Sequence, residues 1–245
     1  MEYIKEYTHL HGKERRQLGF KRRYKVEHPE WDDSMVLLTA AVNERLRQGA
    51  RALDIGCGHG NFVLDELGDV FVEKVGYDLV PEAVSGNRSV DRVVLGDGRG
   101  LPFEAASFDL ALSLWALEHV ANPASLFAEV FRVLRPGGMF AFVTPNKRSL
   151  LISLRRFMSK RIADVLLERI YARKEEDVFD VYYRANSVEV IARLAESVGF
   201  SVELLKENAD PSYTSFGGFS YCLSAWLSSF SFFKPHLVAI LRKPL

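Results

Sequence analysis

The sequence of 245 residues lacks most of the features that mark a specialised class of chain. Its two cysteines, Cys57 and Cys222, exclude a framework of disulfides, and nothing points to an oxidising compartment. Its 32 basic and 32 acidic residues cancel, which argues against a whole-chain electric field that attracts nucleic acid. With 48% hydrophobic and 26% charged residues, the composition is that of an ordinary globular protein.

Long hydrophobic runs are also missing. Residues 1–16 carry no apolar core of the kind found in a secretory signal. The longest apolar stretch, residues 216–233, is interrupted by two glycines and five serines. A membrane-spanning helix needs about 20 mainly apolar residues. We therefore expect no transmembrane segment and a cytoplasmic location.

Short apolar runs alternate with segments of helical periodicity. Apolar residues recur at helical spacing over 123–134 and 188–198, between runs that have the length of buried strands. This alternation predicts βαβ units and a parallel sheet with helices on both faces. The expected strands are residues 50–55, 75–79, 92–95, 108–114, 139–144, 200–205 and 237–241.

The chain divides into four parts by pattern. Residues 1–32 are polar, basic and aromatic without a clean period, so we expect an N-terminal arm. Residues 33–146 carry the α/β alternation, in which Asp32 or Asp33 is expected to cap the first helix. Residues 147–185 interrupt the alternation as a helical insertion, and residues 186–245 complete the sheet, starting with a helix capped by Asn186.

A glycine-rich turn follows the first expected strand. Residues 54–60 read Asp-Ile-Gly-Cys-Gly-His-Gly and lead into a helix. Glycine permits a sharp turn and lets a ligand lie against bare backbone, and N–H groups at a helix start can bind an anion. The dinucleotide fingerprint G-x-G-x-x-G would require glycine where Asn61 stands. This spacing argues against a nicotinamide-dependent dehydrogenase.

The run from Asp54 to Gly60 resembles motif I of the class I S-adenosylmethionine-dependent methyltransferases, acid-x-Gly-x-Gly-x-Gly. Residues 101–103, 107–109, 117–120 and 134–138 are similar to later segments of that family, especially its ubiquinone/menaquinone-type C- and O-methyltransferases. The resemblance covers 34–146 well and 186–205 loosely. It implies an α/β fold: a Rossmann-like seven-stranded sheet, mostly parallel with an antiparallel last strand, plus a helical cap.

The resemblance also implies S-adenosyl-L-methionine as the cofactor and assigns residues to it. Asp78 stands where the family has an acid that accepts hydrogen bonds from the ribose, and Asp97 where it has one that binds the adenine amino group. Taken singly, each acid is equally explained as a turn residue. Cys57 is expected to be a small filler. The residues expected to line the cofactor are Asp54, Gly56, Cys57, Gly58, Gly60, Asp78, Leu79, Asp97, Gly98 and Trp115.

The candidate catalytic residue is His119, whose ordinary pKa suits a general base, although a packing role is an alternative. Trp115 could wall the adenine or the acceptor. Acceptor contacts are expected from His119, Asn146, Tyr182, Tyr183 and Arg184. His9 and His11 supply too few ligands for a metal site, so none is expected.

The insertion has a basic character that bears on the acceptor. Residues 147–176 hold nine basic and four acidic residues, a local charge of +5, interleaved with apolar residues. This pattern fits a lid helix over the site, or contact with an anionic or lipid-linked acceptor. The aromatic stretch 213–233 could form a second lid or a homodimer surface.

These features together predict methyl transfer from S-adenosylmethionine to a small-molecule acceptor, preferably O-methylation by in-line displacement. One alternative is a catalytically silent module that binds S-adenosylmethionine without turnover. Another is an RNA or protein methyltransferase, although the zero net charge and the lack of a nucleic-acid-binding motif argue against a nucleic-acid partner.

Overall fold

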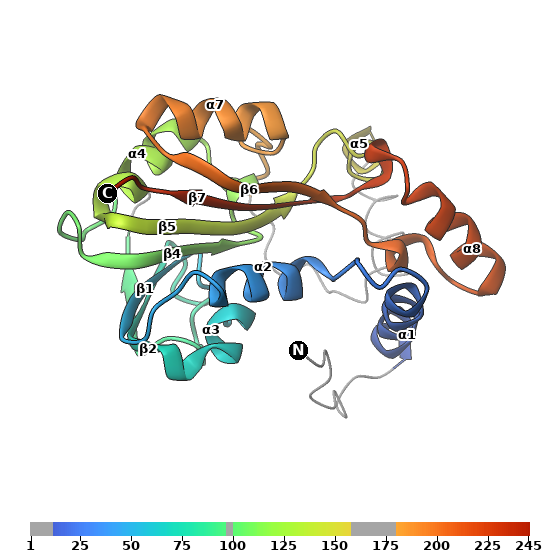
Figure 1. Ribbon diagram of the computed structural model, residues 1–245, viewed down its shortest axis with the longest axis horizontal. Coiled ribbons are helices and arrows are strands. Elements are labelled where there is room, and N and C mark those ends of the chain that lie inside the picture. Colours follow the sequence, from blue (N-terminus) through green and yellow to red (C-terminus); the bar gives the residue numbers. More distant parts are fainter. Residues whose placement is uncertain (1–11, 97–99, 158–179) are drawn as a thin grey trace.

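The computed structural model describes residues 12–96, 100–157 and 180–245, and its centre is a seven-stranded sheet (Figure 1). The strand order is β3-β2-β1-β4-β5-β7-β6. Strands β1 to β5 run parallel, whereas β7 runs antiparallel to both of its neighbours. The strands are β1 (Ala50–Ile55), β2 (Phe71–Asp78), β3 (Arg92–Leu95), β4 (Phe108–Leu114), β5 (Leu134–Pro145), β6 (Ser201–Asn208) and β7 (His236–Arg242).

The predicted α/β fold with a reversed last strand is thereby confirmed. The fifth strand is longer than expected and begins at Leu134 instead of residue 139. Leu134 pairs with Phe108 before a register shift, so the Arg-Pro-Gly-Gly turn is absorbed into the strand as an irregularity.

Helices cover both faces of the sheet. Helices α2 (Ser34–Asn43) and α3 (Phe62–Glu66) pack on one face, and α4 (Pro123–Val133) and α7 (Val188–Val198) on the other (Figure 1). Strand β5 feeds both layers because successive side chains alternate: Phe140 and Phe142 join the α4–α7 core, and Met139, Ala141 and Val143 the α2–α3 core.

Side-chain caps fix where these helices begin. Asp33 caps α2 by accepting from the Met35 N–H at 2.9 Å, as the sequence predicted. The predicted cap of α7 was placed one residue early. Ser187 is the N-cap, and the Asn186 amide instead donates to Thr144 Oγ1 at 2.7 Å.

A group of helices and 3₁₀ turns gathers beyond the carboxyl ends of the parallel strands. These are α1 (Gly12–Glu27), α5 (Leu150–Phe157), α8 (Gly218–Leu227) and the 3₁₀ turns η3 (Pro211–Thr214) and η4 (Ser231–Phe233) (Figure 1). The sequence predicted that the arm joins a helical cap without placing a helix in it, and the structure has α1 there. Its packing rests on few side chains, chiefly Phe20 stacked on Tyr221 at 5.5 Å, so no apolar period marks it in the sequence.

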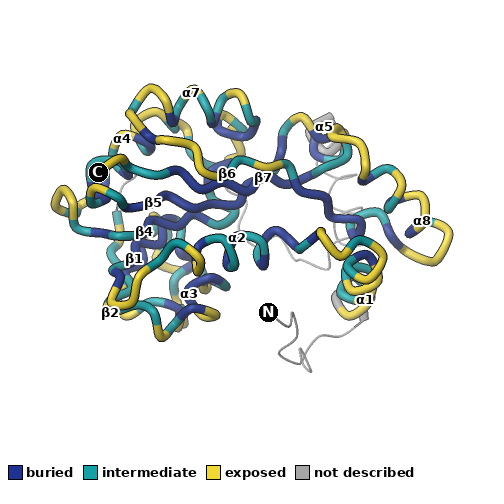
Figure 2. Tube along the Cα trace, viewed as in Figure 1, coloured by how far each residue is buried: buried dark blue, intermediate teal, exposed yellow. Residues whose placement is uncertain are grey.

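Burial follows these layers (Figure 2). The central strands are buried along most of their length, and exposure concentrates on the outer faces of the helices, on α1 and on α8. Among the helices of the described ranges, none has the length and apolar character needed to cross a membrane.

Candidate functional site

The candidate site lies where the strand order reverses. Strand β1 sits between β2 and β4, and the chain continues from β1 to β2 and β3 before it returns to β4 on the other side. In open α/β sheets, ligands bind in the crevice at this switch point, outside the carboxyl ends of the strands. Residues 54–60 leave β1 at this point.

The glycine loop is shaped by two positions. Gly56 has φ +72°, and a Cβ built on it would lie 2.5 Å from Ala116 Cβ, so the loop touches the residues that follow β4. Gly58 has φ +40°, which also favours glycine, but a Cβ there would meet no atom within 4 Å. The backbone at Gly58 therefore faces open space, where a ligand can approach it.

Two residues outside the loop hold it in place. The Asn87 amide donates to the carbonyls of Cys57 at 3.0 Å and Gly58 at 2.8 Å. Ser89 Oγ accepts from the Asn61 N–H at 2.8 Å. Sequence reasoning missed Asn87 and Ser89, whose only signal is an Asn-x-Ser turn in which the Ser89 N–H donates to Asn87 Oδ1.

Asp78 ties the loop to the end of β2. Its Oδ2 accepts from the Gly58 N–H at 2.9 Å, and its Oδ1 accepts from the N–H groups of Leu79 at 2.7 Å and Val80 at 3.0 Å. A carboxylate offers about four lone-pair sites, so one remains on Oδ2. Asp78 is half-buried beside Gly58, where it can accept from a ribose hydroxyl.

Asp54 is the most unusual group in the crevice. It is 1% exposed, and neither of its carboxylate oxygens has a hydrogen-bond partner among the described residues. Burial raises the pKa of Asp54 to about 7, against the opposing effect of the neighbouring Asn61 side chain. The buried Asn61 Nδ2, at the start of α3, likewise lacks an acceptor among the described residues. The two side chains thus leave an acceptor and a donor at the bottom of the crevice that a polar ligand can engage.

Cys57 is packed inside the loop. It is 2% exposed, and burial raises the pKa of its thiol to about 12, so the thiol stays protonated at neutral pH. A Cβ on Gly76 of β2 would lie 2.6 Å from Cys57 Sγ, which shows how closely the sulfur fills the space under the loop.

Trp115 stands on the opposite side of the switch point, directly after β4. Its φ is +57°, a left-handed conformation that costs a bulky residue about 1–3 kcal/mol and that clusters at functional sites. Its N–H donates to the Val143 carbonyl at 3.0 Å, and its ring meets His236 edge-on with centroids 4.7 Å apart. The conformation is thus held from two sides.

His119 comes together with the residues that close the insertion. Its Nδ1 lies 3.0 Å from the Asp180 carbonyl oxygen. Because a carbonyl only accepts, this contact places the proton of the neutral ring on Nδ1 and leaves Nε2 as the basic nitrogen. The N–H groups of Tyr182 and Tyr183 donate to the Glu118 carbonyl at 2.8 and 3.2 Å, so residues far apart in sequence share one rim.

The two other predicted acceptor residues are engaged within the protein. The Asn146 amide is buried and donates to Glu207 Oε1 and the Lys234 carbonyl, each at 3.1 Å. Arg184 donates to the Ala121 carbonyl, and its guanidinium lies 5.3 Å from the centre of the Tyr182 ring. Predicted cofactor residues Asp97 and Gly98, and residues 158–179 of the basic insertion, lie outside the described residues.

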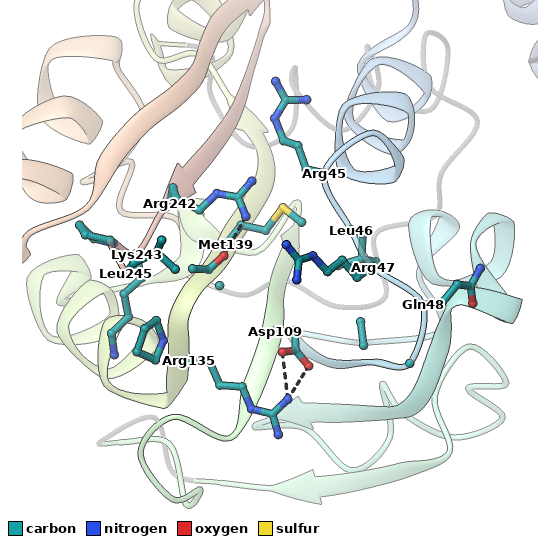
Figure 3. Close-up of a pocket in the computed structure, with 16 residues that line it drawn as sticks. Arg45, Leu46, Arg47, Gln48, Asp109, Arg135, Met139, Arg242, Lys243 and Leu245 are labelled. Atoms are coloured by element: carbon teal, nitrogen blue, oxygen red, sulfur yellow. Dashed lines mark hydrogen bonds and ion pairs between the residues drawn. The ribbon is translucent and has the colours of Figure 1, made fainter.

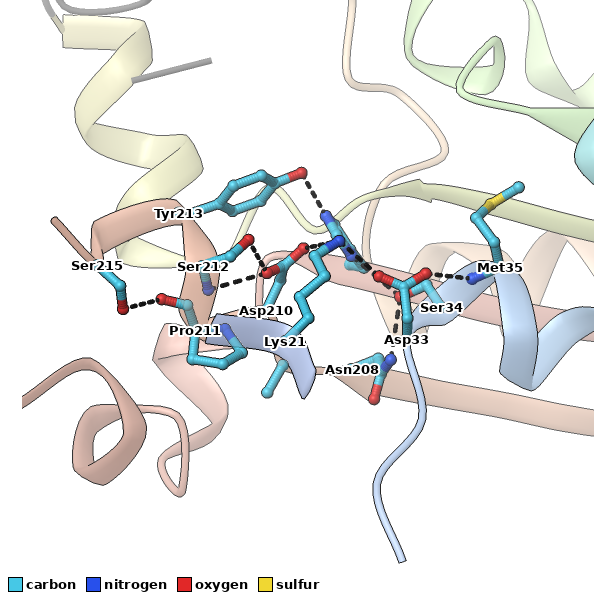
Figure 4. A network of polar contacts seen from close by, with 12 residues as sticks. Lys21, Asp33, Ser34, Met35, Asn208, Asp210, Pro211, Ser212, Tyr213 and Ser215 are labelled. Atoms are coloured by element: carbon cyan, nitrogen blue, oxygen red, sulfur yellow. Dashed lines mark hydrogen bonds and ion pairs between the residues drawn. The ribbon is translucent and has the colours of Figure 1, made fainter. Parts of the chain in front are cut away.

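A buried polar network surrounds His236, whose ring meets Trp115 (Figure 4). The ring of His236 lies between Ser34 Oγ, at 3.0 Å from Nδ1, and the Tyr213 hydroxyl, at 2.7 Å from Nε2. Burial lowers the pKa of His236 to about 4, so the ring is neutral at pH 7. Lys21 of α1 bridges Asp33 at 2.6 Å and Asp210 at 2.9 Å in the same network.

A hollow of about 630 Å³ lies at the opposite ends of the strands from the glycine loop (Figure 3). It is lined by the residues before β1, the start of β5 and the end of β7, among them Arg45, Asp109, Arg135 and Arg242. Arg135 pairs with Asp109 at 2.8 Å, and Arg242 pairs with Glu203 at 2.8 Å. This hollow is therefore a structural groove separate from the crevice. The described ranges contain no cluster of residues able to hold a metal ion.

Comparisons with known proteins agree with this geometry. A family profile described as "Methyltransferase domain" matches residues 53–142. A sterol 4-C-methyltransferase of Caenorhabditis elegans is 32% identical over 127 residues, which is 47% of this chain and 38% of the relative. A ubiquinone biosynthesis O-methyltransferase of Nitrosococcus oceani is 35% identical over 127 residues, which is 49% of this chain and 53% of the relative. The matches thus span about half, or less, of these curated relatives.

The fold has a solved counterpart over nearly its whole length. A chain in the complex between the Haloferax volcanii Trm112 methyltransferase activator and a methyltransferase superposes with a TM-score of 0.61 at 21% identity. The superposition covers 94% of each chain. Residues 53–142 therefore match a methyltransferase domain, and the fold is the one found in S-adenosylmethionine-dependent methyltransferases.

Proposed function

We propose that this chain transfers the methyl group of S-adenosylmethionine to an oxygen atom of a small apolar acceptor. The observation that carries the proposal is the buried Asp54 without a partner, next to open space at Gly58. The cofactor's ammonium would supply the donor that Asp54 lacks, and its carboxylate would accept from Asn61. Its ribose hydroxyls would reach the remaining lone pair of Asp78.

The chemistry asked of the protein is mainly positioning. When bound, the cofactor supplies a methyl group that is already activated by its positive sulfur. The acceptor oxygen would form a bond to the methyl carbon while the carbon–sulfur bond breaks. The electron pair of the broken bond would stay on sulfur. His119 Nε2 would take the hydroxyl proton and pass it to water. Trp115 and the rim around Tyr182 would keep water from the reacting atoms.

The relatives support an apolar acceptor. Their names give a sterol as the substrate of one and ubiquinone biosynthesis as the process served by the other, and both sterols and ubiquinone are largely hydrocarbon. The rim at His119 carries the aromatic side chain of Tyr182, which is 41% exposed and available for apolar contact.

Calorimetry and a label-transfer assay test this function in sequence. We expect S-adenosylhomocysteine to bind and NAD not to bind, since the glycine spacing does not match the dinucleotide fingerprint. With methyl-labelled S-adenosylmethionine, label should move to phenolic or sterol-like acceptors. His119→Asn should lower turnover by about 10²–10⁴-fold with unchanged cofactor affinity.

Each outcome separates a rival function. Cofactor binding without label transfer to any acceptor in the panel would indicate a silent binding module. Label transfer to RNA or protein would contradict the small-molecule acceptor. Full activity of the His119→Asn variant would remove His119 as the base and leave the methyl transfer itself intact.

A further inference from the structure

Helix α8 exposes its apolar side chains to solvent. Its side toward the protein carries Tyr221, Ser224 and Ser228, which are buried. Its outer side carries Phe219, Leu223 and Trp226, which are 87%, 47% and 61% exposed. A helix on the surface of a globular protein ordinarily has the reverse arrangement, with its apolar stripe toward the core.

The polar inner side is well satisfied, so the orientation of α8 is fixed. Ser224 Oγ donates to the Pro211 carbonyl at 2.8 Å and lies 2.6 Å from Thr214 Oγ1. The Tyr221 hydroxyl donates to Glu27, and the guanidinium of Arg23 lies 4.2 Å from the centre of the Tyr221 ring. Rotating α8 to bury its apolar side would break all of these contacts.

The apolar side chains on the exposed side continue past the end of α8. Positions 219, 223 and 226 follow helical spacing within α8, so their side chains lie on one side of it, and beyond the helix the Phe230 ring meets Trp226 with centroids 5.2 Å apart. We call Phe216, Phe219, Leu223, Trp226, Phe230 and Phe232 the α8 face, and each of them is at least 38% exposed. Contiguous apolar patches rimmed by polar residues mark interaction sites.

Helix α1, which packs against α8, carries exposed basic residues. Helix α1 packs against α8 through the stacked rings of Phe20 and Tyr221, and both helices project at the same end of the molecule (Figure 1). Arg15, Arg16 and Arg22 are exposed, and none of them forms an ion pair within the described ranges. The chain as a whole has no net charge, so these arginines make α1 a locally basic helix adjoining α8.

We propose that the α8 face docks on the surface of an anionic lipid bilayer. Aromatic and leucine side chains would enter the region between headgroups and acyl chains, and the arginines of α1 would meet the anionic headgroups. Trp and Phe are suited to this depth because their rings tolerate the boundary between lipid and water. The α8 face follows β6 in the chain and lies beyond the carboxyl ends of the parallel strands, as the crevice does.

The observations favour a bilayer over a second copy of the chain. A stable protein interface needs about 20–30 residues on each side, far more than the six of the α8 face. A two-fold contact through α8 would also bring the arginines of two α1 helices close together, which is unfavourable. A bilayer meets both features, since a few inserted rings and several basic residues suffice for reversible binding.

Vesicle co-flotation of the full chain tests this docking without any methyl transfer. We expect binding to phosphatidylcholine vesicles that contain about one-third phosphatidylglycerol, weakening with added salt. The double variant F219S/W226S and the double variant R15E/R22E should each bind at least about tenfold more weakly. Val72→Ser, which changes an exposed apolar residue on β2, is the matched control and should bind as the unaltered chain does.

Three results would overturn the docking. The first is an absence of binding to the anionic vesicles. The second is binding that persists in F219S/W226S. The third is a concentration-dependent dimer, seen by sedimentation, that F219S/W226S abolishes while vesicles are ignored, which would assign the α8 face to a second copy. Unchanged S-adenosylhomocysteine affinity in both double variants shows that they fold, and keeps this test separate from the methyl transfer.

Discussion

The buried carboxylate of Asp54 is the clearest sign that the crevice is shaped to bind a ligand. A buried carboxylate without donors is costly, and a protein avoids that cost at neutral pH by partial protonation. Replacing Asp54 by asparagine would remove the cost of burying a charge. It would also remove the charge that attracts an ammonium. Stability and ligand binding therefore oppose each other at this position.

The pH dependence of stability should reveal this conflict. The pKa of Asp54 rises from 3.8 to about 7 on folding, so the unfolded chain releases its proton first as the pH rises. The contribution of Asp54 to the free energy of unfolding should fall between pH 4 and pH 7 and stay level above. Asp54→Asn should be more stable than the unaltered chain at pH 8, by up to about 4 kcal/mol, and similar at pH 4.

Urea unfolding of both chains at pH 4, 6 and 8, without cofactor, measures the effect. The same Asp54→Asn variant should bind S-adenosylhomocysteine more weakly at pH 8, since its amide cannot pair with the ammonium as a carboxylate does. A variant that is less stable at pH 8 would show that Asp54 has partners in the folded chain.

Asp78 carries a second prediction at the residue scale. Asp78→Ala should weaken S-adenosylhomocysteine binding by about 1–3 kcal/mol, because a ribose hydroxyl loses its acceptor and the Gly58 N–H loses its tie. Calorimetry measures the dissociation constant. Asp69→Ala, at an exposed acid in η1 (Gly68–Val70), controls for the loss of charge. Unchanged affinity in Asp78→Ala would exclude Asp78 from the site.

At the scale of elements, the glycine loop is expected to be the cradle. Gly58→Val places a branched side chain in the open space beside the loop and strains a left-handed backbone. We expect binding of S-adenosylhomocysteine to be lost while the chain still folds. Gly49→Val is the matched control, since Gly49 has φ +79° and open space around it, but precedes β1 at the far edge. Normal binding by Gly58→Val would contradict the cradle.

Helix α1 is held to the sheet by charge, and that has a measurable consequence. Burial alone would raise the pKa of Asp33, but the Lys21 ammonium and the donors of Lys21 and Met35 outweigh it and lower the pKa to about 2. Lys21→Met leaves two buried carboxylates without their cation and should lower the free energy of unfolding by about 3 kcal/mol at pH 7.

The loss in Lys21→Met should shrink as the pH falls from about 4 toward 2. Asp33 then becomes protonated, and the stabilisation that its lowered pKa provides above pH 4 disappears. Lys25→Met removes an exposed pair with Asp32 and an exposed hydrogen bond to the Pro29 carbonyl, and should cost less than about 1 kcal/mol. Equal losses in both variants would show that the network of Figure 4 does not hold α1 in place.

The elements differ in how well the sequence predicts them. The strands and capped helices of the sheet follow from local signals: apolar runs, Asp33 before α2 and Asn122 with Pro123 before α4. Helix α1 has no such signal, because it packs through two separate rings: Phe20 meets Tyr221, about 200 positions away, and Tyr24 meets Trp31, beyond the end of the helix. The N-cap of α7 was misplaced because the Asn186 side chain serves tertiary contacts to Thr144 and Pro145.

At the scale of the whole molecule, topology decides where the site lies. Parallel strands bring the ends of β1, β2 and β4 to one edge, so the positions of Asp54, Asp78 and Trp115 follow once the alternation is recognised. The residues that support these three side chains cannot be predicted in this way. Asn87, Ser89, Glu118 and His236 act through contacts between distant segments, and a single sequence carries no signal for such contacts.

The most direct test of the cofactor site is a crystal structure with S-adenosylhomocysteine. We expect its ribose hydroxyls within about 2.6–3.0 Å of the Asp78 carboxylate and its ammonium in contact with Asp54, against the backbone of Gly58. A ligand bound elsewhere, or a crevice that stays empty at saturating ligand, would contradict the assignment of this loop.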